Sequence, residues 1–113
     1  MTRTFITTSI FQQAWAEMGL GEEEQQYLEN ALLLHPNAGA VIQGLQGARK
    51  LRISLPNRGK SGGARVIYVD IVAKEQIYLL HAYPKNKQAD LTQEEKKNIS
   101  KIIQAIKGGI RHE

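Results

Sequence analysis

The chain has 113 residues, no cysteine and a formal net charge of +4. This length predicts one domain spanning residues 1–113, and the lack of cysteine excludes disulfides and thiolate ligands or nucleophiles. Neither the N-terminal MTRTFITTSIFQQ nor any later apolar run is typical of an export signal or of the roughly 20 residues that span a membrane, so we expect a cytoplasmic protein.

Two helices are predicted near the N-terminus. A β-like run, Thr4 to Thr7, precedes Ser9, which is a candidate N-cap. The apolar residues that follow have helical spacing: Ile10, Phe11, Ala14, Trp15 and Met18. A second helix begins with the acidic GEEE and ends at Pro36. Together they predict a helical hairpin, in which Trp15 and Tyr27 are most simply core residues.

Strands follow. Residues 37–47 form a Gly-rich connector with no firm assignment. Residues 49–55 alternate between apolar and polar side chains, whereas 64–72 and 77–83 are nearly continuous apolar runs. With the N-terminal run, they predict an antiparallel sheet of about four strands.

The last element is a C-terminal helix. Thr92 followed by Glu95 is a capping-box signature. The isoleucines that follow keep the helical period: Ile99, Ile102, Ile103, Ile106 and Ile110. Gly108 is expected near the C-cap of this helix. The resulting fold class is α+β, with an N-terminal helical hairpin, the sheet and a C-terminal helix.

Charge is unevenly distributed along the chain. Residues 30–68 contain no acid but hold six cations: Arg49, Lys50, Arg52, Arg58, Lys60 and Arg65. Unpaired cations in one segment favour an anionic partner such as a phosphate backbone.

Strand alternation divides these cations. Lys50 and Arg52 share one strand face, while Leu51 and Ile53 point to the other. A hairpin between this strand and the next brings Arg65 near them, so three cations converge. Solvated charges on an exposed face are the alternative for each residue taken singly.

The loop PNRGKSGG carries Arg58 and Lys60. It lacks the GxxxxGK[ST] spacing of a P-loop and is followed by a strand, which excludes that kind of nucleotide site. A cationic arm that grips a backbone and a merely soluble hairpin tip both fit its composition. A second basic segment, with Lys85, Asn86 and Lys87, follows the last predicted strand.

Common catalytic motifs are missing. His35, His81 and His112 are scattered without ligand spacing, so we predict no metal site and no cofactor. His81 lies on an apolar strand, where a packed histidine is expected.

The run GARKLRISLPNRGKSGGARVIY, followed by IYLLHAYPKNKQADLTQEE, resembles the RelE/HigB family of type II toxin–antitoxin toxins. The motifs cover about residues 47–95. The resemblance implies a microbial-RNase-like fold, ribosome-dependent cleavage of mRNA in the A site without metal, and neutralisation by a small antitoxin, in this case a HigA-like helix-turn-helix protein. Ribosome and mRNA are then partners, and a membrane is not.

The resemblance also implies roles for individual residues. In this chemistry the 2′-hydroxyl of RNA attacks the adjacent phosphate. Arg65 matches the family arginine that stabilises the phosphate, Lys50 and Arg52 match a basic pair, and Lys85 matches the basic loop. Arginine is a poor base, so Arg52 is interpreted as a phosphate clamp.

The proton acceptor is Lys50 or Lys85, with His81 a distant third. Asn86 and Thr92 stand near family positions for an arginine and a tyrosine, so neither the general acid nor the stacking aromatic is identified. Tyr83 or Tyr68 is a candidate for stacking or simply a core residue. The expected RNA and ribosome contacts are Arg49, Arg58, Lys60, Asn86 and Lys87.

Two other functions stay open. A ParE-like toxin would bind DNA gyrase without cleaving RNA, and a non-catalytic RNA-binding module would bind RNA with a steep salt dependence.

Overall fold

The computed structural model describes residues 2–55, 63–88 and 90–111. Its strands are β1 (Thr4–Thr7), β2 (Ala40–Val41), β3 (Arg49–Ile53), β4 (Ala64–Ile71) and β5 (Gln76–Pro84). Its helices are α1 (Ser9–Glu17), α2 (Glu22–Leu34) and α3 (Gln93–Arg111), and a short 3-10 helix (Val72–Lys74) links β4 to β5. The predicted α+β class is confirmed.

The sheet has five strands in the order β1-β5-β4-β3-β2. β1 pairs with β5 in parallel, whereas the other pairs are antiparallel, so the prediction of an antiparallel sheet is wrong at this edge. A parallel pair needs a long crossover between its strands, and here the two helices, β3 and β4 supply it. The unassigned connector contains β2, which pairs Ala40 with Lys50.

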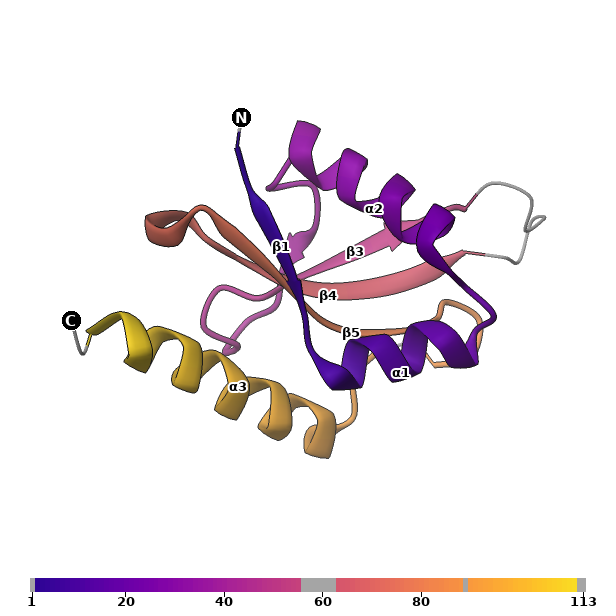
Figure 1. Ribbon diagram of the computed structural model, residues 1–113. Coiled ribbons are helices and arrows are strands. Elements are labelled where there is room, and N and C mark those ends of the chain that lie inside the picture. Colours follow the sequence, from indigo (N-terminus) through magenta and orange to yellow (C-terminus); the bar gives the residue numbers. More distant parts are fainter. Residues whose placement is uncertain (1, 56–62, 89, 112–113) are drawn as a thin grey trace.

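Helices cover both faces of the sheet (Figure 1). α1 and α2 pack on one face around a core that includes Phe11, Leu28 and Tyr68. α3 packs on the other face through Ile99 and Ile103, which are buried against Ile67 and other strand residues. The strands β4 and β5 therefore lie between two apolar layers, as their continuous apolar sequence predicts.

The helix ends differ in part from the predictions. The cap of α1 is Thr8 rather than Ser9, because the Thr8 hydroxyl accepts the Phe11 N–H at 3.0 Å. The capping box of α3 is confirmed: the Thr92 N–H donates to Glu95 Oε1 at 2.9 Å, and the Glu95 N–H donates to Thr92 Oγ1 at 3.1 Å. α3 continues past Gly108 to Arg111, so this glycine lies within its last turn.

The predictions for the two aromatic residues have different outcomes. Trp15 is a core residue, 3% exposed, and its indole N–H donates to the Gly21 carbonyl at 3.1 Å. Tyr27 is 46% exposed, so its assignment to the core is wrong. The helical spacing of apolar residues indicates which face of a helix is buried. It does not indicate how much of that face the rest of the protein covers.

Candidate functional site

The strand register builds two polar rows on the sheet face that α3 partly covers. In an antiparallel sheet, residues directly opposite each other project to the same face. Arg52, Arg65 and Tyr83 form one row, because Arg52 pairs with Arg65 and Arg65 pairs with Tyr83. Lys50, Ile67 and His81 form the second row in the same way. We call these six positions the site face.

Arg52 and Arg65 meet across β3 and β4, as the predicted hairpin requires. Their Cα positions are register partners, so two guanidinium groups start about 5 Å apart on one face. Arg52 is exposed, whereas Arg65 is half-buried and its Nε has no hydrogen-bond partner among the described residues. Like charges in this position destabilise a sheet, and an anion that bridges them removes the repulsion.

Lys50 has a carboxylate beside it. Its Nζ lies 3.4 Å from Asp90 Oδ1, in a half-exposed ion pair. The Leu91 N–H, which donates to the same oxygen at 2.8 Å, lowers the pKa of Asp90, and Lys50 lowers it further. The prediction that these cations are unpaired is wrong for Lys50, because its acidic partner lies 40 positions further along the chain.

Three buried polar atoms on the site face have no hydrogen-bond partner in the described parts of the chain. They are Arg65 Nε, His81 Nδ1 and the Tyr83 hydroxyl. Buried polar atoms in folded proteins are nearly always paired, so such a cluster indicates a place where a ligand or ordered water completes the bonding. Burial raises the pKa of Tyr83, so its hydroxyl keeps its proton at neutral pH and is available as a donor.

Glu95 joins the site face to α3. One of its carboxylate oxygens lies 3.3 Å from His81 Nε2, and the other accepts N–H groups from Gln88 at 3.2 Å and Thr92 at 2.9 Å. Burial opposes ionisation, but these hydrogen bonds outweigh it and lower the pKa of Glu95. The sequence predicts Glu95 as a helix cap, and His81 as a packed residue or a third candidate proton acceptor. The contact between them follows from the packing of α3 on β5.

The basic loop after β5 begins beside the first row. The Lys85 N–H donates to the Gly63 carbonyl at 3.4 Å. Gly63 is required there, because an added Cβ would lie 2.8 Å from the Ile53 carbonyl oxygen and 3.1 Å from Lys85 Cδ. Asn86 and Lys87 are exposed. Lys85 is thus placed next to the arginine row, while Asn86 and Lys87 lie on the rim of the loop.

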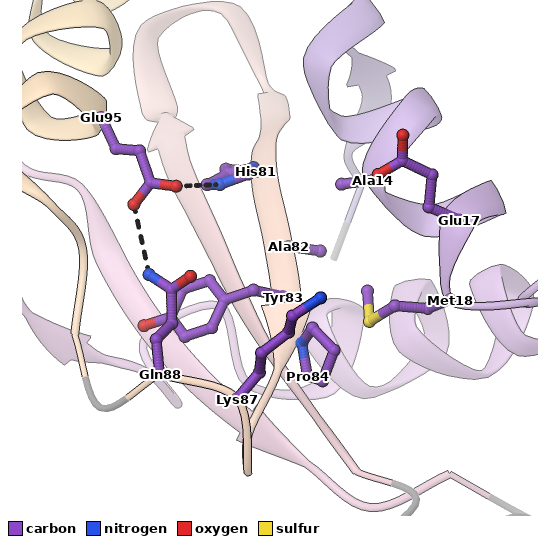
Figure 2. Close-up of a pocket in the computed structure, with 10 residues that line it drawn as sticks. All are labelled: Ala14, Glu17, Met18, His81, Ala82, Tyr83, Pro84, Lys87, Gln88 and Glu95. Carbon is purple, nitrogen blue, oxygen red and sulfur yellow. Dashed lines mark hydrogen bonds and ion pairs between the residues drawn. The ribbon is translucent and has the colours of Figure 1, made fainter.

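A hollow of about 260 Å³ opens beside β5, between α1 and this loop. Figure 2 shows Glu17 of α1 and the next residue, Met18, on one side, Glu95 and Gln88 on the other, and His81 and Tyr83 between them. The sequence carried no signal for it, since the residues of its two walls, such as Met18 and His81, lie more than 60 positions apart.

Arg49 and Tyr68 lie on the opposite sheet face. The Arg49 guanidinium donates to the Gly39 carbonyl at 2.7 Å and to the Asn37 carbonyl at 3.3 Å. The Tyr68 hydroxyl accepts the Gly39 N–H at 2.9 Å and donates to the Pro36 carbonyl at 2.7 Å. Tyr68 is fully buried and cannot stack on a base. Of its two predicted roles, stacking residue or core residue, the core role is confirmed.

Of the other predicted residues, Arg58 and Lys60 lie outside the described residues. Within residues 2–55, 63–88 and 90–111, no group of three or more metal-ligating side chains is found. No described helix is long and apolar enough to cross a membrane.

Comparisons with known proteins agree with this architecture. Residues 38–110 match the family described as the RelE toxin of the RelE/RelB toxin–antitoxin system. A mutant of the E. coli toxin RelE in the free state has a similar structure, with a TM-score of 0.57 and 18% identity over 91% of this chain and 99% of that chain. At this identity the likeness shows the fold.

Two further structures have the same fold. The toxin–antitoxin complex RelBE of E. coli matches with a TM-score of 0.52 and 17% identity, covering 74% of this chain and 95% of that chain. The isolated E. coli RelE toxin matches with a TM-score of 0.51 and 15% identity, covering 90% of this chain and 99% of that chain. Because the family match spans residues 38–110, which include both rows of the site face, the chain belongs to the family of RelE toxins of toxin–antitoxin systems.

Proposed function

We propose that this toxin is an endoribonuclease that blocks translation by cutting mRNA in the ribosomal A site. The observation that carries the proposal is the opposed pair of Arg52 and Arg65, with the unpartnered Nε of Arg65 next to Tyr83. A guanidinium group presents several N–H donors in a plane and suits the phosphate, which is the anionic group of RNA.

The reaction requires charge stabilisation and two proton transfers. The 2′-oxygen forms a bond to phosphorus, the bond to the 5′-oxygen breaks, and a 2′,3′-cyclic phosphate remains. Arg65 and Arg52 would stabilise the extra negative charge on the phosphate oxygens, and the protonated Tyr83 hydroxyl would donate a further hydrogen bond. Either Lys50 or Lys85, which lie at the two ends of the arginine pair, is the proposed acceptor of the 2′-hydroxyl proton in its neutral amine form, and the leaving 5′-oxygen takes up a proton from water.

Asp90 gives Lys50 a partner before RNA arrives. In the free toxin its carboxylate lies beside the ammonium group at 3.4 Å, in a half-exposed position. An RNA phosphate would take the place of this carboxylate. Because the pair is accessible to water, the exchange costs little.

We further propose a cognate antitoxin, with a HigA-like helix-turn-helix protein as the candidate, and the ribosome with its mRNA as the target. One similar structure is a RelE toxin bound to its antitoxin. The toxin would act without metal in the cytoplasm. The neighbouring reading frame is the cheapest check of the antitoxin, since it should encode a small acidic or DNA-binding protein.

Primer extension on mRNA after induced expression tests the proposal. New 5′ ends in phase with codons should appear with the wild-type toxin. Arg65→Ala should lower the cleavage rate about a hundredfold to a thousandfold, the usual effect of removing one donor to a developing charge. Lys101→Ala, which removes an exposed cation of α3, is the matched control and should cleave normally.

Other outcomes assign other functions. Growth arrest with unbroken mRNA and inhibited gyrase would identify a ParE-like toxin. Binding of RNA that weakens steeply with salt, without cleavage on ribosomes, would identify an RNA-binding module. Full activity of Arg65→Ala together with Lys50→Ala would show that the reaction does not take place on the site face.

A further inference from the structure

We propose that the hollow between α1 and β5 binds a nucleobase of the RNA strand whose phosphate lies on the arginine pair. The inference rests on the proposed function and adds a base-binding subsite to it. Tyr83 joins the two places, because it lies opposite Arg65 in the register and also lines the hollow (Figure 2).

The hollow exists because β1 and β5 separate. β1 pairs with β5 only as far as Leu79, and the Thr8 hydroxyl then bonds to the Leu80 carbonyl at 3.0 Å as the chain turns into α1. The segment from His81 to Pro84 is therefore an edge of the sheet, and an edge strand presents main-chain N–H and C=O groups that no further strand pairs. α1 lies alongside this edge and forms the second wall.

The lining suits a flat heterocycle with a polar rim. Ala14, Met18 and Pro84 are half-buried and give apolar contacts, which a base needs on its faces. Glu17, Lys87 and Gln88 place donors and acceptors around the opening. Single-stranded RNA is commonly bound by such a combination of base contacts beside a cationic path for the backbone.

The charge of the hollow distinguishes a base from a phosphate. Glu17 and Glu95 both line it and outnumber its lysine, Lys87, so the carboxylates make the lining unfavourable for an anion. The cations of the site face, by contrast, lie in rows on β3 and β4. A nucleotide therefore has one orientation that satisfies both places, with its phosphate toward Arg65 and its base toward Met18.

Nuclear magnetic resonance titration of the purified toxin tests the subsite. The probes are the four nucleoside 5′-monophosphates, with ribose 5-phosphate as the ligand that lacks a base. The nucleotides should shift amide signals of Ala14, Met18 and Gln88 as well as those around Arg65, whereas ribose 5-phosphate should shift only the latter. Equal shifts from both kinds of ligand in the hollow, or none from either, would overturn the proposal.

A matched pair of variants on α1 sharpens the test. Ala14→Met fills the hollow with a side chain of high helix propensity, and Ala16→Met adds the same group at an exposed position outside the hollow. Ala14→Met should weaken nucleotide binding about tenfold, the scale of one lost base-stacking contact, and leave ribose 5-phosphate binding unchanged. Ala16→Met should behave as wild type.

The outcomes separate this inference from the proposed function. Wild-type nucleotide affinity in Ala14→Met would overturn the base subsite even if mRNA is still cleaved. Base-dependent shifts in a protein that cuts no mRNA would support the subsite and refute the nuclease. If the hollow instead accepts a side chain of the antitoxin and ignores nucleotides, the titration shows no base-dependent shift and the subsite is refuted.

Discussion

Arg52 and Arg65 lie directly opposite each other on neighbouring strands, so each guanidinium group stands in the repulsive field of the other. Such a pair lowers the stability of the free protein and favours whatever anion bridges it. The alternation of β3 and the register of β4 place Lys50, Arg52 and Arg65 on one face of the sheet. Arg49 lies on the other face, because it is the register partner of Tyr68.

Replacing Arg52 should therefore raise stability while lowering activity. Arg52→Thr, which keeps a good strand former, should increase the free energy of unfolding by up to about 1 kcal/mol at low salt, because one of two opposed charges is gone. Urea denaturation measures this, and the gain should shrink as salt screens the charges. The control Lys101→Thr should show no salt-dependent gain. A loss of stability in Arg52→Thr at low salt would contradict the repulsion.

Two buried tyrosines provide a matched comparison. Tyr68→Phe removes a hydroxyl with two hydrogen bonds and leaves the Gly39 N–H and the Pro36 carbonyl without it, which should cost about 1–3 kcal/mol. Tyr83→Phe removes a hydroxyl without a partner in the described structure and should leave stability unchanged or higher. Thermal denaturation measures both.

The two substitutions should affect activity in the opposite way to stability. Tyr83→Phe should cleave ribosome-bound mRNA more slowly, because a donor to the phosphate is lost, whereas folded Tyr68→Phe should cleave at the wild-type rate. Single-turnover cleavage below the melting temperature of each variant makes the comparison. If Tyr83→Phe is as active as wild type, its hydroxyl is not part of the site.

Arg49 and Lys50 are neighbours in sequence with different expected roles. Arg49→Gln loses the bonds to the carbonyls of Gly39 and Asn37 and should lose about 1 kcal/mol of stability, with cleavage retained. Lys50→Gln should lower cleavage with little effect on unfolding, since its ion pair is half-exposed. Measuring both properties for both variants tests the assignment. A loss of RNA affinity in Arg49→Gln equal to that in Lys50→Gln would support the prediction that Arg49 contacts RNA.

Acid stability should depend on Glu95. The folded-state pKa of Glu95 is below its ordinary value of 4.5, so its contribution is present above that pH and is lost as the pH falls through the lower folded value. Glu95→Gln removes this titration, so its stability should fall less steeply with acid below about pH 4.5. Denaturation at a series of pH values between 6 and 2.5 measures the slope.

The exposed neighbour supplies the control for this prediction. Glu94→Gln changes the same charge on the same turn of α3 and should keep the steep wild-type slope. If Glu95→Gln has the wild-type slope as well, the contacts of Glu95 with His81, Gln88 and Thr92 do not couple folding to pH.

The sequence by itself determined the elements and their chemistry. The apolar period of α3, the capping box at Thr92 and the continuous apolar run of β4 are local patterns, and local patterns follow from backbone geometry and hydrogen bonding within a few residues. Alternation along β3 also placed Lys50 and Arg52 on one face, because the period of a strand is two residues.

Tertiary structure decided the contacts between distant segments. That Asp90 reaches Lys50, that Glu95 holds His81 and that Arg49 serves the loop of Asn37 and Gly39 depends on which strands pair and on how α3 crosses them. The parallel position of β1 and the hollow beside β5 have the same origin. Such contacts arise from the packing of whole layers, which no short window of sequence specifies.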